Sequence, residues 1–210
     1  MTDFLDATRT SYDKVAVSYE ELLRDHLATN AADRAVLGMF AEYTTGQVAD
    51  VGCGPGRITA HLASLGLDAF GVDLSPGMVE VARERHRGLR FEVGSMTGLD
   101  LPDGALGGVV AWYSVIHVPP ELHPEVFAGF FRVLAPGGHL LLAFQAGDER
   151  RHITEGYGHQ VDLVAYRLPP ERIAAQVVDA GFELRTTVVR APEPPNEKVQ
   201  QAYLIARKPG

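Results

Sequence analysis

The sequence predicts an α/β fold built on a mostly parallel sheet. Two observations indicate this: apolar runs of strand length alternate with helical patterns, and a glycine cluster joins the end of the first run to the start of a helix. Parallel neighbours need a crossover connection, so the alternation is typical of parallel sheets. Only the loop 191–198, which contains Pro192, Pro194 and Pro195, separates the last two runs, so these should pair antiparallel.

The expected elements follow one another within a single domain of residues 1–210. Pro76 suits the first turn of a helix, and Gly181 suits a helix stop. The seven expected strands are 47–51, 68–72, 89–93, 106–112, 139–144, 182–189 and 199–206. The four expected helices between them are 57–65, 76–87, 124–134 and 170–180.

Two segments lie outside this alternation. Residues 1–45 are expected to form N-terminal helices, at 8–27 and 31–43, and the first of these is a candidate lid. Residues 145–168 are expected to form an insertion over the active-site edge of the sheet rather than a linker to another domain.

Composition excludes several classes of protein. Cys53 is the only cysteine, which excludes an intramolecular disulfide framework and a cysteine-built zinc site. With 27 acidic against 19 Lys and Arg residues, the net charge of −8 disfavours nucleic acid as a partner. No apolar run approaches the roughly 18 residues of a membrane span, and the N-terminal residues lack the pattern of a secretory signal. We therefore expect a cytoplasmic protein, monomeric or homodimeric, without membrane contact.

The densest chemical signal is the segment Asp-Val-Gly-Cys-Gly-Pro-Gly-Arg at residues 50–57. Alternating glycines allow a ligand to touch the backbone at a strand end. Asp73 ends the next expected strand, 21 residues after Gly52, where a carboxylate can accept hydrogen bonds from both hydroxyls of a ribose. A dinucleotide fingerprint needs a third glycine at position 57 or 59, and these positions hold Arg57 and Thr59. The pattern predicts a nucleoside pocket that is not of the dinucleotide type.

This segment resembles the first motif of the class I S-adenosylmethionine-dependent methyltransferases. The segment 134–142, Leu-Ala-Pro-Gly-Gly-His-Leu-Leu-Leu, is similar to the family's turn into strand five, and 11–19 is similar to its N-terminal cofactor-covering helix. The resemblance implies a three-layer, Rossmann-like, seven-stranded sheet, mostly parallel with an antiparallel last strand, plus an N-terminal helical lid. It also implies S-adenosyl-L-methionine as cofactor and S-adenosyl-L-homocysteine as product.

The resemblance also implies roles for individual residues. The family commonly has an acid where Ser95 stands and another near Gly107, so this chain departs from it at two positions. Cys53 is expected to act mainly in packing, between glycines that allow close approach. The implied cofactor-binding set is Asp50, Gly52 and Trp112 at the methionine part, Gly54 and Gly56 in the loop, Asp73 at the ribose, Leu74, Met78, Ser95 and Met96 at the adenine, with Tyr19 and Cys53 alongside.

Methyl transfer needs a base only where the acceptor carries a proton, and histidine suits that task near neutral pH. The candidate bases are His117, His152 and His159. For His117, a structural function that ties the strand 106–112 to a neighbouring backbone is an equally good interpretation. For His152 and His159, the alternative is that they are exposed loop residues. His123 is expected to face solvent. Three tyrosines are candidates for contact with the acceptor: Tyr12, Tyr113 and Tyr157.

No metal is expected. His152, Glu155 and His159 have the spacing of a helical turn, but Gly156 and Gly158 argue against a helix there.

The Asn or Asp followed by two prolines that marks amino-methylating nucleic-acid enzymes of the family is absent at 112–115, which favours a small-molecule acceptor. The methylated atom of this acceptor could be oxygen, nitrogen, sulfur or carbon. A dinucleotide-dependent oxidoreductase and a non-catalytic module with the cofactor fold remain alternatives.

Overall fold

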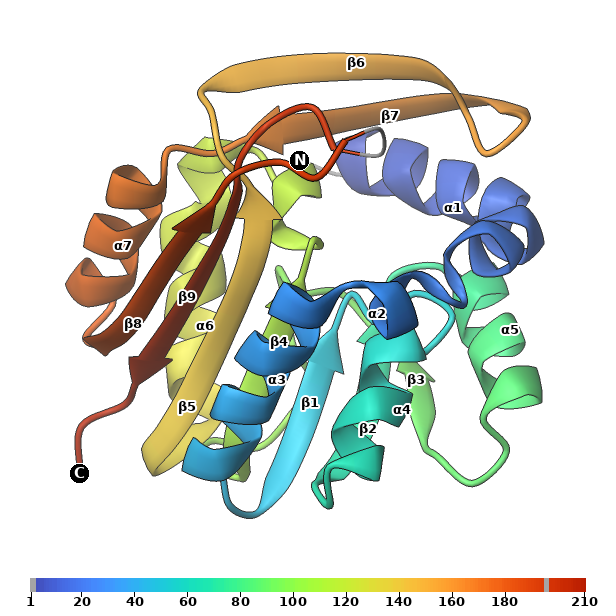
Figure 1. Cartoon of the computed structure of the whole chain (residues 1–210). Coiled ribbons are helices and arrows are strands. Elements are labelled where there is room, and N and C mark those ends of the chain that lie inside the picture. The colour runs from blue at the N-terminus through green and yellow to red at the C-terminus, as the bar shows by residue number, and fades with distance from the viewer. Residues whose placement is uncertain (1–2, 195–196) are drawn as a thin grey trace.

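The computed structural model describes residues 3–194 and 197–210, and its centre is a seven-stranded sheet in the order β3-β2-β1-β4-β5-β9-β8 (Figure 1). Its strands are β1 (Gln47–Val51), β2 (Asp68–Asp73), β3 (Phe91–Val93), β4 (Leu106–Trp112), β5 (Leu134–Gln145), β8 (Glu183–Arg190) and β9 (Gln201–Arg207). The first five pair in parallel, and β9 is antiparallel to both β5 and β8. The predicted fold class is confirmed. Pro195, in the connection expected between the last two strands, lies outside the described residues.

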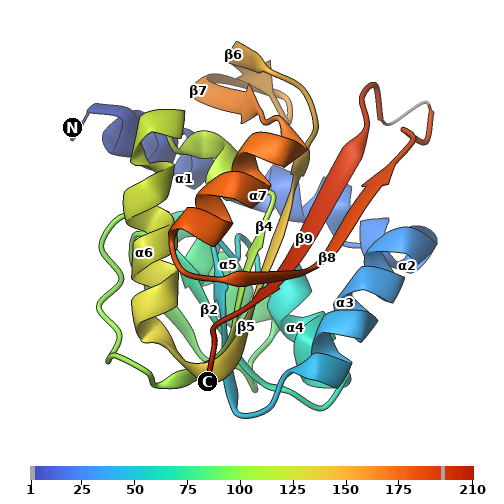
Figure 2. The same ribbon diagram turned by 90° about the vertical axis from the view of Figure 1, so that its left-hand side faces the viewer.

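Helices cover both faces of the sheet, which makes three layers (Figure 2). One face carries α3 (Ala31–Tyr43) and α4 (Arg57–Ser64), and the other carries α6 (His123–Val133) and α7 (Pro170–Asp179). The helix α5 (Pro76–Arg85) packs beside β3, where Val79 and Ala82 contact Phe91. Two short 3₁₀ helices, η1 (Val115–His117) and η2 (Pro120–Leu122), connect β4 to α6.

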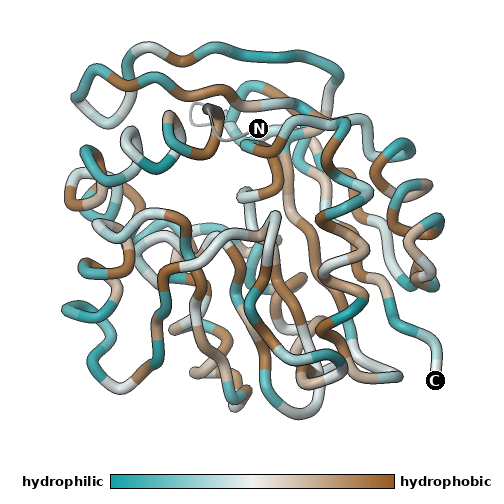
Figure 3. The backbone as a smooth tube through the Cα atoms, turned by 180° about the vertical axis from the view of Figure 1, so that it is seen from behind, coloured by the Kyte–Doolittle hydropathy of each residue, from teal (hydrophilic) through white to brown (hydrophobic). Residues whose placement is uncertain are grey.

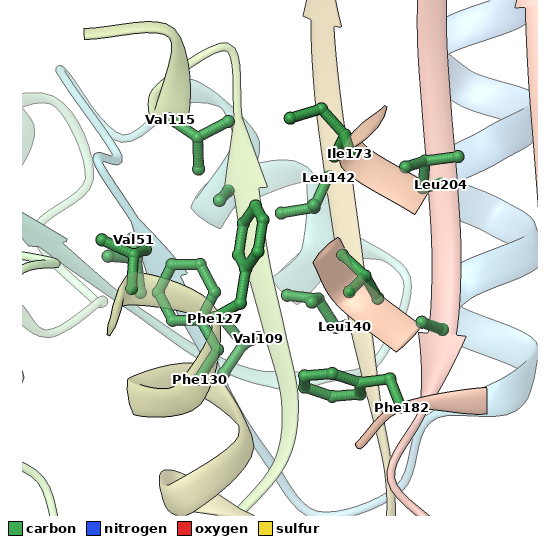
Figure 4. Packing of buried hydrophobic residues seen from close by; sticks show 14 of the residues in the cluster. Val51, Val109, Val115, Phe127, Phe130, Leu140, Leu142, Ile173, Phe182 and Leu204 are labelled. Carbon is green, nitrogen blue, oxygen red and sulfur yellow. The ribbon is translucent and has the colours of Figure 1, made fainter. Parts of the chain in front are cut away.

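The larger core lies between the sheet and the α6–α7 layer (Figure 4). Phe127 and Phe130 of α6 are fully buried against Val109 of β4 and Leu140 of β5. Central strands buried on both faces read as continuous apolar runs, and Figure 3 shows hydrophobic residues concentrated along them. This burial explains why strand positions were readable from the sequence.

The N-terminal helices differ in their bounds from the expected ones. The helix α1 (Asp3–Leu23) starts five residues earlier than predicted and is followed by a separate short helix, α2 (His26–Thr29). The Asn30 side chain then accepts a hydrogen bond from the backbone N–H of Asp33 and caps α3. None of the described helices is long and apolar enough to cross a membrane.

Residues 145–168 contain a β-hairpin that stands apart from the main sheet. Its strands are β6 (Glu149–Gly156) and β7 (His159–Arg167), paired antiparallel, and Figure 1 shows them beside α1 above the sheet edge. Tyr157, at the tip, has a positive φ of 53° and precedes Gly158 at 78°. The hairpin excludes the helical turn that a metal site at His152, Glu155 and His159 required.

Gly107 of β4 explains one departure from the family pattern. A Cβ atom at this position would lie 1.5 Å from the carbonyl oxygen of Thr45, which belongs to the chain segment leading into β1. No side chain fits there without moving backbone, so the acid that the family commonly carries near this position is sterically excluded.

We expect Gly107→Ala to lower the free energy of unfolding by about 3 kcal/mol or more, because the added methyl group overlaps a backbone carbonyl. Gly129→Ala in α6 is the matched control: nothing lies within 4 Å of its added Cβ, and alanine in a helix interior should stabilise by about 0.5–1 kcal/mol. Urea unfolding curves measure both. Equal midpoints for Gly107→Ala and the wild type would contradict the steric argument.

Candidate functional site

A cleft opens at the carboxyl ends of β1, β2 and β4, roofed by α1. Its empty volume, counted to the open mouth, is about 900 Å³. The strand order reverses between β1 and β4, and ligands of doubly wound sheets bind at such a switch point. Most of the side chains predicted from the sequence line this cleft. They are Tyr12, Tyr19, Asp50, Gly52, Cys53, Gly54, Asp73, Leu74, Met78, Ser95, Met96, Trp112, Tyr113 and His117.

The glycine loop, residues 52–56, forms the floor of the cleft. Gly52, Gly54 and Gly56 have φ angles of 77°, 55° and 83°, in the left-handed region that side chains disfavour. A Cβ on Gly52 would lie 2.3 Å from Cβ of Ser114, whereas a Cβ on Gly54 would only approach Tyr19 and Met78 across the cleft, at 3.9 and 4.0 Å.

Gly56 has a different function from the close approach predicted for it. A Cβ there would lie 2.7 Å from the ring of Phe91, behind the loop, and Gly56 serves as the N-cap residue of α4. Ser95, the other departure from the family pattern, uses its hydroxyl locally: it lies 2.8 Å from Oγ1 of Thr97 and accepts from the Thr97 backbone N–H.

Asp73 connects the end of β2 to the glycine loop and to α5. One carboxylate oxygen accepts from the backbone N–H of Gly54 at 2.7 Å, and the other accepts from the N–H of Ser75 at 2.9 Å. Burial raises the pKa of Asp73 to about 6, an effect that the hydrogen bonds from Ser75 and Gly54 partly offset.

Asp50, at the end of β1, is fully buried beneath the loop. The hydroxyl of Thr59 donates to its Oδ2 at 2.7 Å, while its Oδ1 has no hydrogen-bond partner among the described residues. Burial, with the nearby charge of Asp73 as a smaller cause, raises the pKa of Asp50 to about 7. A buried carboxylate oxygen without a partner is costly, so it marks a place where a polar or cationic ligand group would fit.

Cys53 is buried, and burial raises the pKa of its thiol well above the usual value. The thiolate needed for nucleophilic chemistry is therefore disfavoured. Its Sγ packs with Phe91 and Val79, in keeping with the packing function expected of it.

The roof is tied to the sheet side of the cleft. Oδ1 of Asp13 in α1 accepts from the hydroxyl of Ser75 at 2.6 Å and from the backbone N–H of Gly77 at 2.9 Å. About two turns further along α1, Glu20 forms an ion pair of 3.0 Å with Arg85 of α5. These contacts hold α1 against α5 beside the loop.

The roof is also tied to the hairpin. Lys14 donates to the carbonyl of Gln160, Ser11 accepts from the backbone N–H of Asp162, and the hydroxyl of Ser18 lies 3.0 Å from Nε2 of His159. The ring of Tyr157 packs on that of Tyr19 at a centroid distance of 4.8 Å. His159 and Tyr157 therefore hold the roof and do not themselves line the cleft.

His117 joins three elements at the far wall. Its Nδ1 lies 2.9 Å from the carbonyl oxygen of Val164 in β7, and its Nε2 lies 2.6 Å from the hydroxyl of Tyr12 in α1. A carbonyl only accepts, so Nδ1 carries the proton; burial lowers the pKa of His117 and keeps the ring neutral. Nε2 therefore accepts from Tyr12.

A groove adjoins the cleft on the hairpin side, with His117, Phe4 and Thr8 lining both. His152 lies in the groove, half exposed, and donates from Nε2 to Asp162 at 2.7 Å. The third predicted base, His159, lies in neither hollow. Only His117 of the three histidines lines the cleft itself.

Trp112 and Tyr113 form the wall at the end of β4. The indole of Trp112 packs on the ring of Tyr203 at 5.5 Å, and its Nε1 is buried with no hydrogen-bond partner in the described part of the chain. Tyr113 has a positive φ of 53° and donates from its hydroxyl to Gln201 of β9 at 2.8 Å. Strain of this kind in a residue other than glycine is most often found at functional sites.

The expectation that His123 faces solvent is wrong. The side chain is fully buried, and its Nε2–H is shared between the carbonyls of Val115 and Val118 at 3.3 and 3.1 Å. These carbonyls belong to the 3₁₀ turn after β4 and to the residue that ends it; that of Val115 also accepts from the backbone N–H of Val118. His123 thus holds the turn that carries His117.

Sequence reasoning missed several lining residues. Phe4, Leu5 and Thr8 belong to the first turns of α1, which were expected to begin later. Ser114 donates to the carbonyl of Val51 across the loop, and no sequence signal marked it. Arg57 directly follows the last glycine and lines the cleft; its charged side chain at the first position of α4 was the available signal.

No group of three His, Cys, Asp or Glu side chains suited to a metal ion occurs within residues 3–194 and 197–210.

Comparison with known proteins finds methyltransferases. Residues 48–138 match a family model described as a methyltransferase domain. The chain is 29% identical over 161 residues to a malonyl-[acyl-carrier protein] O-methyltransferase of Serratia marcescens, covering 74% of this chain and 59% of that protein. It is 33% identical over 143 residues to phosphoethanolamine N-methyltransferase 3 of Arabidopsis thaliana, covering 65% and 29%. The chain thus spans less than two thirds of the length of either relative.

A solved structure shares the fold over almost the whole chain. It is the Burkholderia thailandensis 1,6-didemethyltoxoflavin-N1-methyltransferase with bound 1,6-didemethyltoxoflavin and S-adenosylhomocysteine. The TM-score is 0.74 at 20% identity, with 99% of this chain and 90% of that chain covered. Residues 48–138 thus match a methyltransferase domain, and the glycine loop, Asp73 and the strand order of the sheet are similar to those of the class I S-adenosylmethionine-dependent methyltransferases.

Proposed function

We propose that this protein transfers a methyl group from S-adenosylmethionine to a small-molecule acceptor. The observation that carries the proposal is the cleft at the switch point, where a glycine floor, two buried carboxylates and an aromatic roof meet. A cytoplasmic location, a monomeric or homodimeric state and the absence of nucleic acid from its partners belong to the same proposal.

The residues of the cleft fit the cofactor. The unpartnered Oδ1 of Asp50 suits the ammonium group of the amino-acid end, and Asp73 keeps lone pairs for ribose hydroxyls beside its two backbone bonds. Leu74, Met78 and Met96 offer apolar contacts for a purine ring at the β2 side. When bound, the cofactor supplies a methyl group already activated by its positively charged sulfur.

Positioning is the main task that remains for the protein. A nucleophile held in line at about 3–3.5 Å gains several kcal/mol over free encounter. The groove beside the cleft offers a path for the acceptor, because His117, Phe4 and Thr8 line both hollows. Its walls combine the aromatic ring of Tyr166 with the polar groups of Arg150 and His152, which suits a small polar or aromatic molecule.

The pair formed by Tyr12 and His117 is placed to take a proton from the acceptor. The hydroxyl of Tyr12, which lines the cleft, donates its own proton to Nε2 of His117, and its oxygen keeps lone pairs that can accept another proton. A proton leaving the acceptor passes to this oxygen, while the tyrosine proton moves to Nε2. Nδ1–H stays bonded to the carbonyl of Val164 throughout. His117 is thus the proposed base, and Tyr12 is the group that touches the acceptor.

The first prediction concerns the cofactor. S-adenosylmethionine and S-adenosylhomocysteine, each at 100 times its Kd, should stabilise the folded protein by about 2.7 kcal/mol, seen as a raised Tm in thermal unfolding. NAD and NADP should leave the Tm unchanged. Stabilisation by NAD or NADP alone would favour the oxidoreductase alternative, and binding without turnover on any acceptor would favour the non-catalytic module.

The second prediction concerns the base. His117→Asn keeps an N–H for the carbonyl of Val164 but removes the acceptor for Tyr12, and Tyr12→Phe removes the hydroxyl. Each should lower kcat about 100-fold, measured as S-adenosylhomocysteine release with an acceptor found by screening, with S-adenosylhomocysteine affinity nearly unchanged. His152→Asn, in the wall of the groove, is the comparison variant: its effect should fall on the KM for the acceptor, with kcat kept within about threefold. A large loss of kcat in His152→Asn together with full activity of His117→Asn would show that His152, and not His117, is the base.

The third prediction concerns pH. Because burial raises the pKa of Asp50 to about 7 and that of Asp73 to about 6, both groups are mostly protonated in the free protein at pH 5. A cationic ligand favours the ionised carboxylates and must displace those protons. The Kd for S-adenosylmethionine should therefore fall as pH rises from 5 to 8, by up to about tenfold per pH unit for each titrating group.

Calorimetric titration in buffers of different ionisation enthalpy measures both the Kd and the released protons. Asp50→Asn should remove the part of the dependence near pH 7 and leave the part near pH 6. S-adenosylhomocysteine, whose sulfur is neutral, should depend less on pH. A Kd for S-adenosylmethionine that stays constant over this range would show that neither acid contacts the charged part of the ligand.

A further inference from the structure

The groove beside the cleft is lined by an exposed cationic side chain, Arg150 of β6, that no protein group neutralises. In the described part of the chain, its guanidinium forms no ion pair and no hydrogen bond. Of the two acids that precede it in the sequence, Asp148 pairs with Arg172 at 2.9 Å. The other, Glu149, pairs with Arg167 at 2.6 Å. The charge of Arg150 is therefore available to a ligand.

The register of the hairpin explains why Arg150 lines the groove and its neighbour Arg151 does not. Across the two strands, Arg150 pairs with Tyr166, and His152 pairs with Val164. Directly paired residues of an antiparallel hairpin lie on the same face, and all four of these line the groove. Successive side chains of a strand alternate between faces, so Arg151 lies on the opposite face and lines neither the groove nor the cleft.

The groove is large enough for an organic molecule and offers it apolar walls. Its empty volume, counted to the open mouth, is about 1090 Å³. The one acid among its described lining residues, Asp162, accepts from His152 at 2.7 Å, which leaves Arg150 as the unpaired charge of the lining. The apolar and aromatic side chains of the lining come from three segments of the chain; they are Phe4, Ala7, Pro119, Val164 and Tyr166.

The groove leads from Arg150 to the pair formed by Tyr12 and His117. His117 lines both the groove and the cleft, and its Nδ1 donates to the carbonyl of Val164 in β7. Arg150 pairs with Tyr166, two residues beyond Val164 along β7, which is a rise of about 7 Å. A molecule that reaches from Arg150 to Tyr12 therefore presents a different group at each end.

The proposed base limits what the group at Tyr12 can be. Tyr12 and His117 take a proton from the acceptor, and a carboxylate at neutral pH has no proton to give. The methylated group of such an acceptor is therefore a hydroxyl, an amine or a thiol, whose proton passes to the oxygen of Tyr12. An acid group on the same molecule stays ionised throughout and serves only for binding.

We propose that the acceptor is a small organic acid whose carboxylate binds Arg150 and whose hydroxyl, amine or thiol lies at Tyr12. This inference rests on the proposed function, because it presupposes that methyl transfer takes place beside Tyr12. The planar fork of arginine matches a carboxylate with two parallel hydrogen bonds. Tyr166, on the same face of the hairpin as Arg150, and Phe4 of α1 offer rings to an aromatic body between the two groups.

A paired screen tests the charge of the acceptor. Hydroxybenzoates, aminobenzoates and mercaptobenzoates are each compared with the neutral amide of the same skeleton. Turnover is measured as S-adenosylhomocysteine release, and binding by calorimetric titration of the protein saturated with S-adenosylhomocysteine. The wild type should favour the acids over their amides by about tenfold in kcat/KM or in Kd.

Arg150→Met and Arg151→Met are matched variants, because both side chains are exposed on β6 and only the first lines the groove. Arg150→Met should raise the KM for the acid about tenfold, with kcat within about twofold and the amide unchanged. Arg151→Met should behave as the wild type. Added salt should raise the KM for the acid in the wild type but not in Arg150→Met, because ions screen an exposed charge pair.

The outcomes that overturn this inference differ from those that overturn the proposed function. Equal use of acids and amides by the wild type, or a panel in which no acid binds, removes the acid group from the acceptor. An equal loss for acids and amides in Arg150→Met assigns Arg150 to the structure of the hairpin, and an equal effect of Arg151→Met excludes a specific contact. The Tm with S-adenosylhomocysteine alone reports on the cofactor site: a raised Tm leaves the proposed function standing, and an unchanged Tm overturns it as well.

Discussion

The carboxylate of Asp73 is the interaction on which the geometry of the cleft depends. It receives the backbone N–H of Gly54 from the loop after β1 and that of Ser75 from the start of α5, so one side chain aligns two strand ends and two helix starts. The hydroxyl of Ser75 in turn donates to Oδ1 of Asp13 in α1. Floor and roof are thus connected through one acid, which explains why the protein retains a charged group where burial raises its pKa to about 6.

The roof, α1, is held in position by side-chain contacts on two sides. Asp13 and Glu20 bind α5, while Lys14 and Ser18 bind the hairpin. Between these two sets of contacts, Tyr12 and Tyr19 face the cleft. Because α1 has few fully buried residues apart from Val15 and Ala16 in the described set, its stability comes mainly from this docking. A ligand that fills the cleft adds a further surface for the roof to bind.

Much of the fold was readable from the sequence, because strands buried on both faces give continuous apolar runs and glycines mark their ends. The bounds of β1 and β4 match the expected ones. The hairpin was not predicted, because β6 is mostly exposed and polar and carries no apolar run. β7 does alternate, with Val161, Leu163 and Ala165 covered between the exposed Gln160 and Asp162, but nothing in the sequence marks its pairing with β6. His123 was misjudged because its partners are carbonyls, which leave no trace in a sequence.

The site residues also fall into two groups, those that the sequence predicts and those that only the structure brings together. Asp50, Gly52 and Asp73 belong to local motifs at strand ends, where spacing alone brings them together. The pairing of Tyr12 with His117 joins residues 105 positions apart through a hydrogen bond of 2.6 Å, and the third member, the carbonyl of Val164, comes from the hairpin. No pattern in one sequence connects such distant positions, and the tautomer of His117 follows only once that carbonyl is located.

The charged side chains that line the cleft determine which net charge of a ligand it favours. With Asp50 and Asp73 ionised and Arg57 positive, the lining carries one negative charge in excess, which a ligand with one net positive charge neutralises in a buried space. A neutral product leaves that excess uncompensated, and the carboxylate of Asp50, whose pKa burial raises to about 7, regains a proton more readily. The same burial that strains the free site therefore favours the charged substrate over the neutral product near neutral pH.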